Sequence, residues 1–245
     1  MPYRKQEFIK GEIYHIVVRG IDDNLIFKNK DDYYRGIFSI YEFNTIEPIE
    51  IRERRRIRAK IKKSLKNPRG GPSSADKREI DKREKLVEIL AFCFMPNHIH
   101  LLLKEVKQKG ITKFMRKLGT GYGGYFNRKY DRKGYVFQNR FLAVHIKNQK
   151  QLETIFVYIH TNPISLIEPK WKERGIRDSK KVGRFLNGYR WSSYLDYIGK
   201  KNFPSVSERS FLTKIIGGED NCKELVNAQI KHKEKIERFS EIYLE

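Results

Sequence analysis

The sequence predicts an α+β protein with helices on one face of an antiparallel sheet. Short segments with the apolar patterns of strands alternate with longer segments whose apolar residues recur at helical spacing, in the order βα, ββ, α, β, α. The most apolar part of the chain, residues 91–103, consists of two strand-like halves joined by Pro96-Asn97, a turn that favours a hairpin. With 245 residues, the chain can bury a substantial core.

The opening elements form a β-α unit. Residues 13–19 have strand character, and Gly20 ends the strand. Asp31 is placed to cap a helix that runs to about Phe43, with an apolar stripe at helical spacing. The residues of that stripe include Tyr34, Ile37, Phe38 and Tyr41.

After the central hairpin, residues 112–130 are predicted to form a helix, although four glycines weaken it. Such a helix is either broken or packed very close to another backbone. Residues 141–146 are a further strand, and residues 150–162 form a helix that Pro163 stops. We expect one domain over residues 1–165 and a peripheral helical extension over residues 166–245, with a final helix near 222–243.

The charge points to a polyanionic partner. The chain has 52 Lys and Arg against 30 Asp and Glu, a formal net charge of +22, which favours nucleic acid. Residues 52–85 form a basic insertion, with 15 Lys and Arg against 5 Asp and Glu, a net of +10, around a turn-rich centre. This segment is either a solvated surface or an arm that wraps the phosphate backbone. No apolar signal or membrane segment is apparent, so we expect a cytoplasmic protein.

Two histidines open the second strand of the hairpin. His98 and His100 are separated by one residue, so both point to the same face of the strand, which makes half of a metal site. The ordinary alternative is a polar pair on a half-exposed strand.

On the predicted helix 150–162, Tyr158 and Asn162 are four residues apart and share one face. Asn162 could complete a site for Mg²⁺ or Mn²⁺, and Tyr158 would be a nucleophile toward phosphorus. Alternatively, Tyr158 is a half-buried helix tyrosine and Asn162 only ends the helix.

Four ordered motifs resemble those of a known family. They are residues 95–100 (Met-Pro-Asn-His-Ile-His), 134–141 (Gly-Tyr-Val-Phe-Gln-Asn-Arg-Phe), 158–163 (Tyr-Ile-His-Thr-Asn-Pro) and 191–194 (Trp-Ser-Ser-Tyr). Together they resemble the single-tyrosine transposases of the HUH superfamily, and most closely the REP-associated tyrosine transposases. The resemblance extends from about Tyr14 to Tyr197, while the basic insertion and the residues after Ser205 depart from the family pattern.

The resemblance implies a ferredoxin-like fold, akin to RNA-recognition modules, and a DNA transposase that acts on single-stranded or hairpin DNA. It implies that Tyr158 forms a 5′-phosphotyrosine intermediate and that His98, His100 and Asn162 bind a divalent metal ion, Mg²⁺ or Mn²⁺. Tyr122, Tyr125, Tyr130 and Tyr135 are weaker nucleophile candidates. Candidate DNA contacts are Arg116, Lys117, Arg128, Lys129, Gln138, Arg140 and Lys147.

Two other functions stay open at this point. The first is a non-transposing protein that binds DNA or RNA hairpins through its basic surface. The second is a replication-initiator or relaxase-like nickase, which shares the histidine pair. Whether the protein is a monomer or a homodimer is also open.

Overall fold

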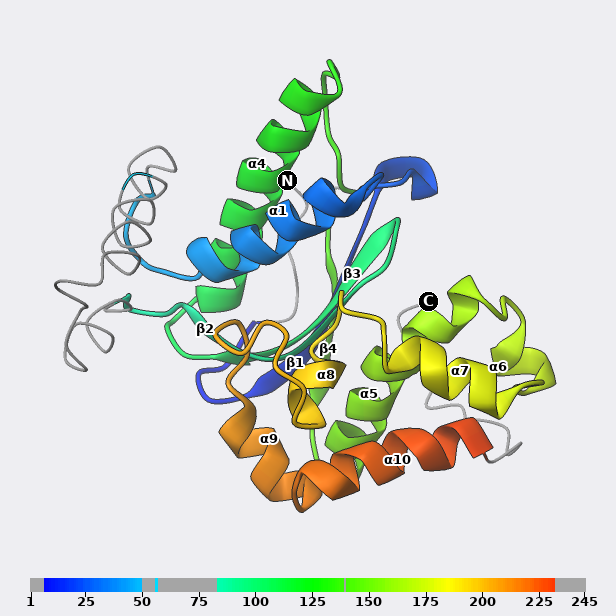
Figure 1. Ribbon diagram of the computed structural model, residues 1–245. Coiled ribbons are helices and arrows are strands. Elements are labelled where there is room, and N and C mark those ends of the chain that lie inside the picture. The colour runs from blue at the N-terminus through cyan, green and yellow to red at the C-terminus, as the bar shows by residue number, and fades with distance from the viewer. Residues whose placement is uncertain (1–6, 50–55, 57–82, 139, 232–245) are drawn as a thin grey trace, which may run out of the picture.

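A computed structural model describes residues 7–49, 56, 83–138 and 140–231 (Figure 1). Its centre is a four-stranded sheet with the order β2-β3-β1-β4, in which every neighbouring pair is antiparallel. The strands are β1 (Ile13–Arg19), β2 (Val87–Phe94), β3 (His98–Glu105) and β4 (Leu142–Ile146). Helix α1 (Lys30–Glu42) connects β1 to β2, and helix α4 (Gly110–Lys129) connects β3 to β4. This β-α-β-β-α-β order and strand arrangement confirm the predicted ferredoxin-like α+β fold.

One face of the sheet carries the first hydrophobic core, against α1 and α4. In β3, the alternate residues Ile99, Leu101 and Leu103 belong to this core and are completely buried. His98 and His100 therefore point to the opposite face, as the alternation along the strand predicted. In β2 the alternation is interrupted by a register shift between Ile89 and Ala91, the position of a bulge.

Helix α4 is continuous despite its four glycines, and one of them, Gly121, packs closely against the end of α1. A Cβ atom at Gly121 would lie 2.1 Å from Cζ of Phe43, at the end of α1. Asp32 of α1 adds a polar link between the two helices. Its carboxylate accepts hydrogen bonds from Tyr125 (3.0 Å), Lys129 (2.7 Å) and Tyr130 (2.6 Å) of the α4 segment.

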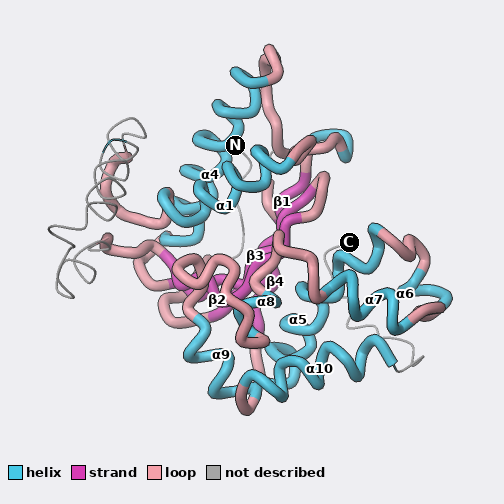
Figure 2. Tube along the Cα trace, viewed as in Figure 1, coloured by secondary structure: helices cyan, strands magenta, loops and turns pink. Residues whose placement is uncertain are grey.

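Helices also cover the other face of the sheet, which differs from the single helical layer that we expected (Figure 2). Helix α5 (Gln149–Thr161) contacts β2 and β3 there, and Ile155, Phe156 and Ile159 are buried in a second hydrophobic core. The extension contributes to the same core, which includes Leu90 and Leu102 of the sheet. Its helices are α6 (Trp171–Arg174), α7 (Ser179–Leu186), α8 (Tyr194–Tyr197), α9 (Arg209–Ile216) and α10 (Glu219–Lys231). The segment after Pro163 is therefore an integral layer and not a peripheral one.

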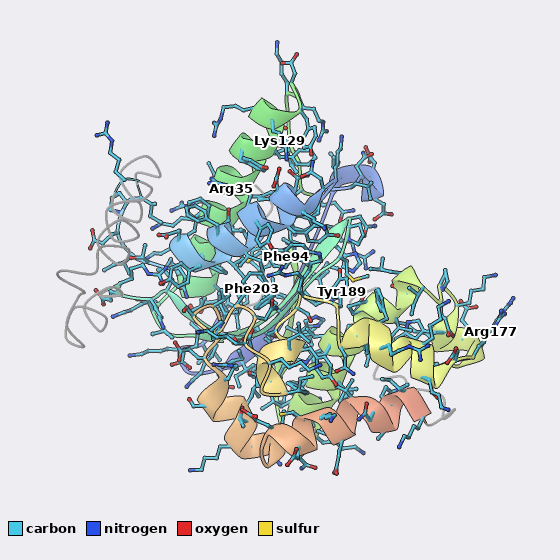
Figure 3. The ribbon with its side chains drawn as sticks, viewed as in Figure 1. Arg35, Phe94, Lys129, Arg177, Tyr189 and Phe203 are labelled. Atoms are coloured by element: carbon cyan, nitrogen blue, oxygen red, sulfur yellow. The ribbon has the colours of Figure 1, made fainter. Side chains whose placement is uncertain are left out.

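The motif at residues 191–194 runs along β2, at an edge of the described sheet. The amide of Phe94 donates to the carbonyl of Trp191 (2.8 Å), and the amide of Ser193 donates to the carbonyl of Phe92 (3.0 Å). Tyr189 approaches the same strand (Figure 3), and its hydroxyl donates to the carbonyl of Phe94 (2.6 Å). These bonds occupy backbone groups of an edge strand that would otherwise be exposed.

Two expectations fall on residues outside the described part. Almost all of the basic insertion, 52–85, lies there, and the final helix is described only as far as Lys231. Within the described residues, no helix combines the length and the apolar character that crossing a membrane requires.

Candidate functional site

The candidate site is formed by β3 and by helix α5, which packs on it. His100 lies opposite Val17 of β1, and His98 lies opposite Arg19 at the end of the same strand. The two imidazole rings have their centroids 4.8 Å apart and meet edge to face. Because both side chains are fixed by a paired central strand, the sheet holds their separation rigidly.

Each histidine has its Nδ1 atom engaged by a neighbouring side chain. Nδ1 of His98 lies 2.7 Å from Oδ1 of Asn97, which as an oxygen can only accept, so this nitrogen carries the ring proton. Nδ1 of His100 lies 3.0 Å from Nε2 of His15, a fully buried residue of β1. Nε2 of His100 is buried and has no hydrogen-bond partner among the described residues. His15 could not be identified from the sequence, because only the register of β1 against β3 brings the two rings together.

The surroundings of His100 favour the neutral imidazole. Complete burial lowers the pKa of His100 well below its ordinary value, and the nearby His98, His15, Lys172 and Arg19 lower it further. A neutral imidazole has a nitrogen lone pair, which is the form that binds metal ions.

Tyr158 lies on α5, directly over this histidine cluster. Its ring centroid is 5.5 Å from that of His100 and 5.9 Å from that of His15, in both cases edge to face. The residue is 3% exposed. Nζ of Lys172, on α6, is 4.7 Å from the centroid of the Tyr158 ring. Lys172 could not be identified from the sequence either, because it belongs to a short helix in the extension.

Asn162 follows Tyr158 by one helical turn, at the end of α5, and is 1% exposed. Its backbone carbonyl accepts a hydrogen bond from Ser165 (2.9 Å). Among the described residues, no group of three or more His, Cys, Asp or Glu side chains could hold a metal ion. The predicted ligand set contains only two such side chains, since its third member is an amide.

His160 connects α5 to the 191–194 motif. Its Nε2 atom lies 2.8 Å from Oγ of Ser193, which also accepts from the amide of Phe92 (3.0 Å). Burial lowers the pKa of His160 to about 3, so the ring is neutral at physiological pH. Two of the recognised motifs are thus joined by a buried hydrogen bond beside Tyr158.

The competing tyrosines are engaged elsewhere. Tyr125 and Tyr130 donate to Asp32, and the hydroxyl of Tyr122 donates to the carbonyl of Ile26, all on the α1 and α4 side of the sheet. Tyr135 is 72% exposed in the loop before β4. Within the described part of the chain, none of these four rings contacts the two histidines of β3.

The candidate DNA contacts divide into two groups. Those on α4 belong to the helix that packs on the sheet face opposite His100 and Tyr158. Lys117 donates to the carbonyls of Thr45 (2.6 Å) and Glu47 (2.7 Å), and Lys129 pairs with Asp32. These two lysines therefore have structural partners, whereas Arg116 and Arg128 are exposed.

The second group lies around β4. Gln138, Arg140 and Lys147 are exposed. The amide of Gln138 donates to the carbonyl of Arg19 (2.9 Å), the residue that lies opposite His98. This hydrogen bond places the backbone of Gln138 beside the end of β1 that pairs with His98.

Comparisons with known proteins agree with the family resemblance of the sequence motifs. Residues 77–162 match a family model described as "Transposase IS200 like", a segment that contains both histidines, Tyr158 and Asn162. This match confirms that the chain is similar to the single-tyrosine transposases, as its motifs predicted. A search of curated proteins found no match.

Among solved structures, the chain is similar to a REP-associated tyrosine transposase bound to a REP hairpin. Sequence identity is 15% and the TM-score is 0.37, over 86% of this chain and 96% of that chain. Because both values are low, neither the fold nor the function assigned to this chain depends on that match.

Proposed function

We propose that this protein is a transposase of the REP-associated tyrosine type, which cleaves a single DNA strand next to a hairpin and transfers the strand. The observation that carries the proposal is the contact of Tyr158 with the His98 and His100 cluster across the packed α5 and β3 interface. Of the tyrosines considered, Tyr158 alone is in ring contact with His100 while also lying inside the matched family segment.

In the proposed reaction, the phenol oxygen of Tyr158 attacks a backbone phosphorus. A bond forms between this oxygen and phosphorus, and the bond from phosphorus to the 3′ oxygen of the preceding nucleotide breaks. The phenol gives up one proton, and the departing 3′ oxygen gains one. The DNA 5′ end stays on Tyr158, and the phosphotyrosine bond retains the energy needed to join the strand to another 3′ hydroxyl.

The side chains fit a divalent metal ion. The buried Nε2 atom of His100 has no hydrogen-bond partner among the described residues, and a metal ion would satisfy it. His98 would be the second ligand, through the nitrogen opposite its Asn97 contact, and Asn162 would be the third. A bound Mg²⁺ or Mn²⁺ ion would supply charge that polarises the scissile phosphate.

Lys172 adds positive charge beside the nucleophile. Its ammonium group, 4.7 Å from the centroid of the Tyr158 ring, is close enough to attract a phosphate brought to the phenol oxygen. Its charge also favours the developing negative charge on phosphate during attack. We assign Lys172 the role of holding the scissile phosphate in line with Tyr158.

The net charge of +22 supports DNA as the partner. We propose that Gln138, Arg140 and Lys147 contact the strand that enters the site, and that Arg116 and Arg128 contact more distant phosphates. Lys117 and Lys129 are weaker candidates, because they already bind protein groups. The cytoplasmic location stays a prediction.

The proposal is tested by incubating the protein with single-stranded DNA from the flanks of its own gene and Mn²⁺, then looking for a covalent adduct by denaturing electrophoresis. Tyr158→Phe removes one hydroxyl and keeps the buried ring, so we expect the fold to survive and the adduct to vanish. Tyr125→Phe is the matched control, and it should still form the adduct. If hairpin DNA binds but no adduct forms with the unmodified protein, the chain is a non-transposing binding protein.

A further inference from the structure

We propose that His15 is a positioning residue that fixes the tautomer and ring orientation of His100, so that Nε2 of His100 faces the metal ion. This inference rests on the proposed function, because it concerns the same site. It assigns a role to a residue of β1 that lies outside the segment matched by the family model.

The sheet holds the two rings in contact. His15 lies opposite Leu102, and Val17 lies opposite His100, so the two histidines are diagonal neighbours on one face of the β1-β3 pair. Their ring centroids are 5.3 Å apart with only 10° between the ring planes. Nε2 of His15 and Nδ1 of His100 are 3.0 Å apart, and both residues are fully buried.

This contact determines which nitrogen of His100 is able to bind a metal ion. A neutral imidazole carries one proton, so a ring that binds metal through Nε2 must carry its proton on Nδ1. That N–H group needs an acceptor, and Nε2 of His15 is at hydrogen-bond distance. His15 then carries its own proton on Nδ1. In metal sites, such acceptors orient the ligand ring and increase its basicity.

A packing role alone does not account for the pair. The Nε2 atom of His100 is buried without a hydrogen-bond partner among the described residues, which is unfavourable in a purely structural pair. If Nε2 of His100 is a metal ligand, the bound ion accounts for the lack of a hydrogen-bond partner. The neighbouring His98 has the same arrangement, since its Nδ1 atom is held by Asn97. Both rings are therefore held from the Nδ1 side.

The experiment measures Mn²⁺ affinity of the full chain by electron paramagnetic resonance, with no DNA present. His15→Leu fills similar space but cannot accept a hydrogen bond, and we expect affinity to fall by about 10- to 100-fold. In His15→Gln, the amide oxygen is able to reach the position of Nε2, so this variant should retain most of the affinity. His145→Leu is the matched control. His145 lies on β4, opposite Tyr14, and stacks on it at the other face of the sheet, so its loss should leave Mn²⁺ affinity unchanged.

Thermal unfolding of each variant shows whether the fold is intact. The inference is overturned if His15→Leu binds Mn²⁺ as tightly as the unmodified protein does. It is also overturned if His15→Gln loses as much affinity as His15→Leu, because packing would then explain both. If the unmodified protein itself binds no Mn²⁺, the proposed metal site fails, and the role of His15 fails with it.

Discussion

Ser193→Ala tests whether the extension holds α5 in position. Oγ of Ser193 accepts from the amide of Phe92 (3.0 Å) and lies 2.8 Å from Nε2 of His160, and all three residues are fully buried. The substitution removes one oxygen and leaves two buried polar groups without this partner. At roughly 1–3 kcal/mol for each group, we expect the free energy of unfolding to fall by about 2–6 kcal/mol.

Urea denaturation of the full chain at neutral pH measures this change, provided that the slope of the transition stays constant. The neighbouring Ser192 is a matched control. It is also buried, but among the described residues its hydroxyl makes only long contacts, 3.5 Å to the carbonyl of Tyr189 and 3.4 Å to the amide of Tyr194. Ser192→Ala should therefore cost less than about 1 kcal/mol. Equal losses in the two variants would refute the coupling of the 191–194 motif to α5.

The other predictions concern the site and the packing of α1 on α4. His100→Ala should abolish the covalent adduct but leave hairpin binding nearly unchanged in a filter-binding assay, because phosphate contacts supply most of the affinity. Lys172→Met should slow adduct formation at saturating DNA by about 100-fold in single-turnover kinetics, and Lys172→Arg should be affected less because it keeps the charge. Burial disfavours the Asp32 carboxylate, but hydrogen bonds from Lys129 and Tyr130 outweigh burial and lower its pKa below the ordinary 3.8. This stabilisation is present above pH 3.8 and is lost as the pH falls further, so Asp32→Asn should cost on the order of 3 kcal/mol at pH 7 and progressively less below pH 4 in acid unfolding.

The sheet and its two connecting helices could be predicted because their signals are local. The strand at 13–19 has the predicted bounds, and α5 differs from its predicted range by one residue at each end. Close packing at the glycines of α4 was predicted against another backbone, but it is found at Gly121 and against the side chain of Phe43. Such features depend on periodicity and turn chemistry within a few residues of chain.

The parts that could not be predicted depend on contacts between distant segments. His15 reaches His100 across 85 positions through strand register, and Ser193 reaches His160 across 33 positions. The second helical layer also escaped prediction, because its apolar stripes do not indicate which face of the sheet they cover. Lys172 approaches Tyr158 only as a result of that layer.

Peptide mapping shows whether Tyr158 becomes covalently bonded to DNA. The protein is incubated with single-stranded DNA from its own flanks and Mn²⁺, digested with trypsin and nuclease, and examined by tandem mass spectrometry. We expect the retained nucleotide on the phenol oxygen of Tyr158, in an amount that falls when Mn²⁺ is chelated. A nucleotide found instead on Tyr125, Tyr130 or Tyr135 would contradict this expectation.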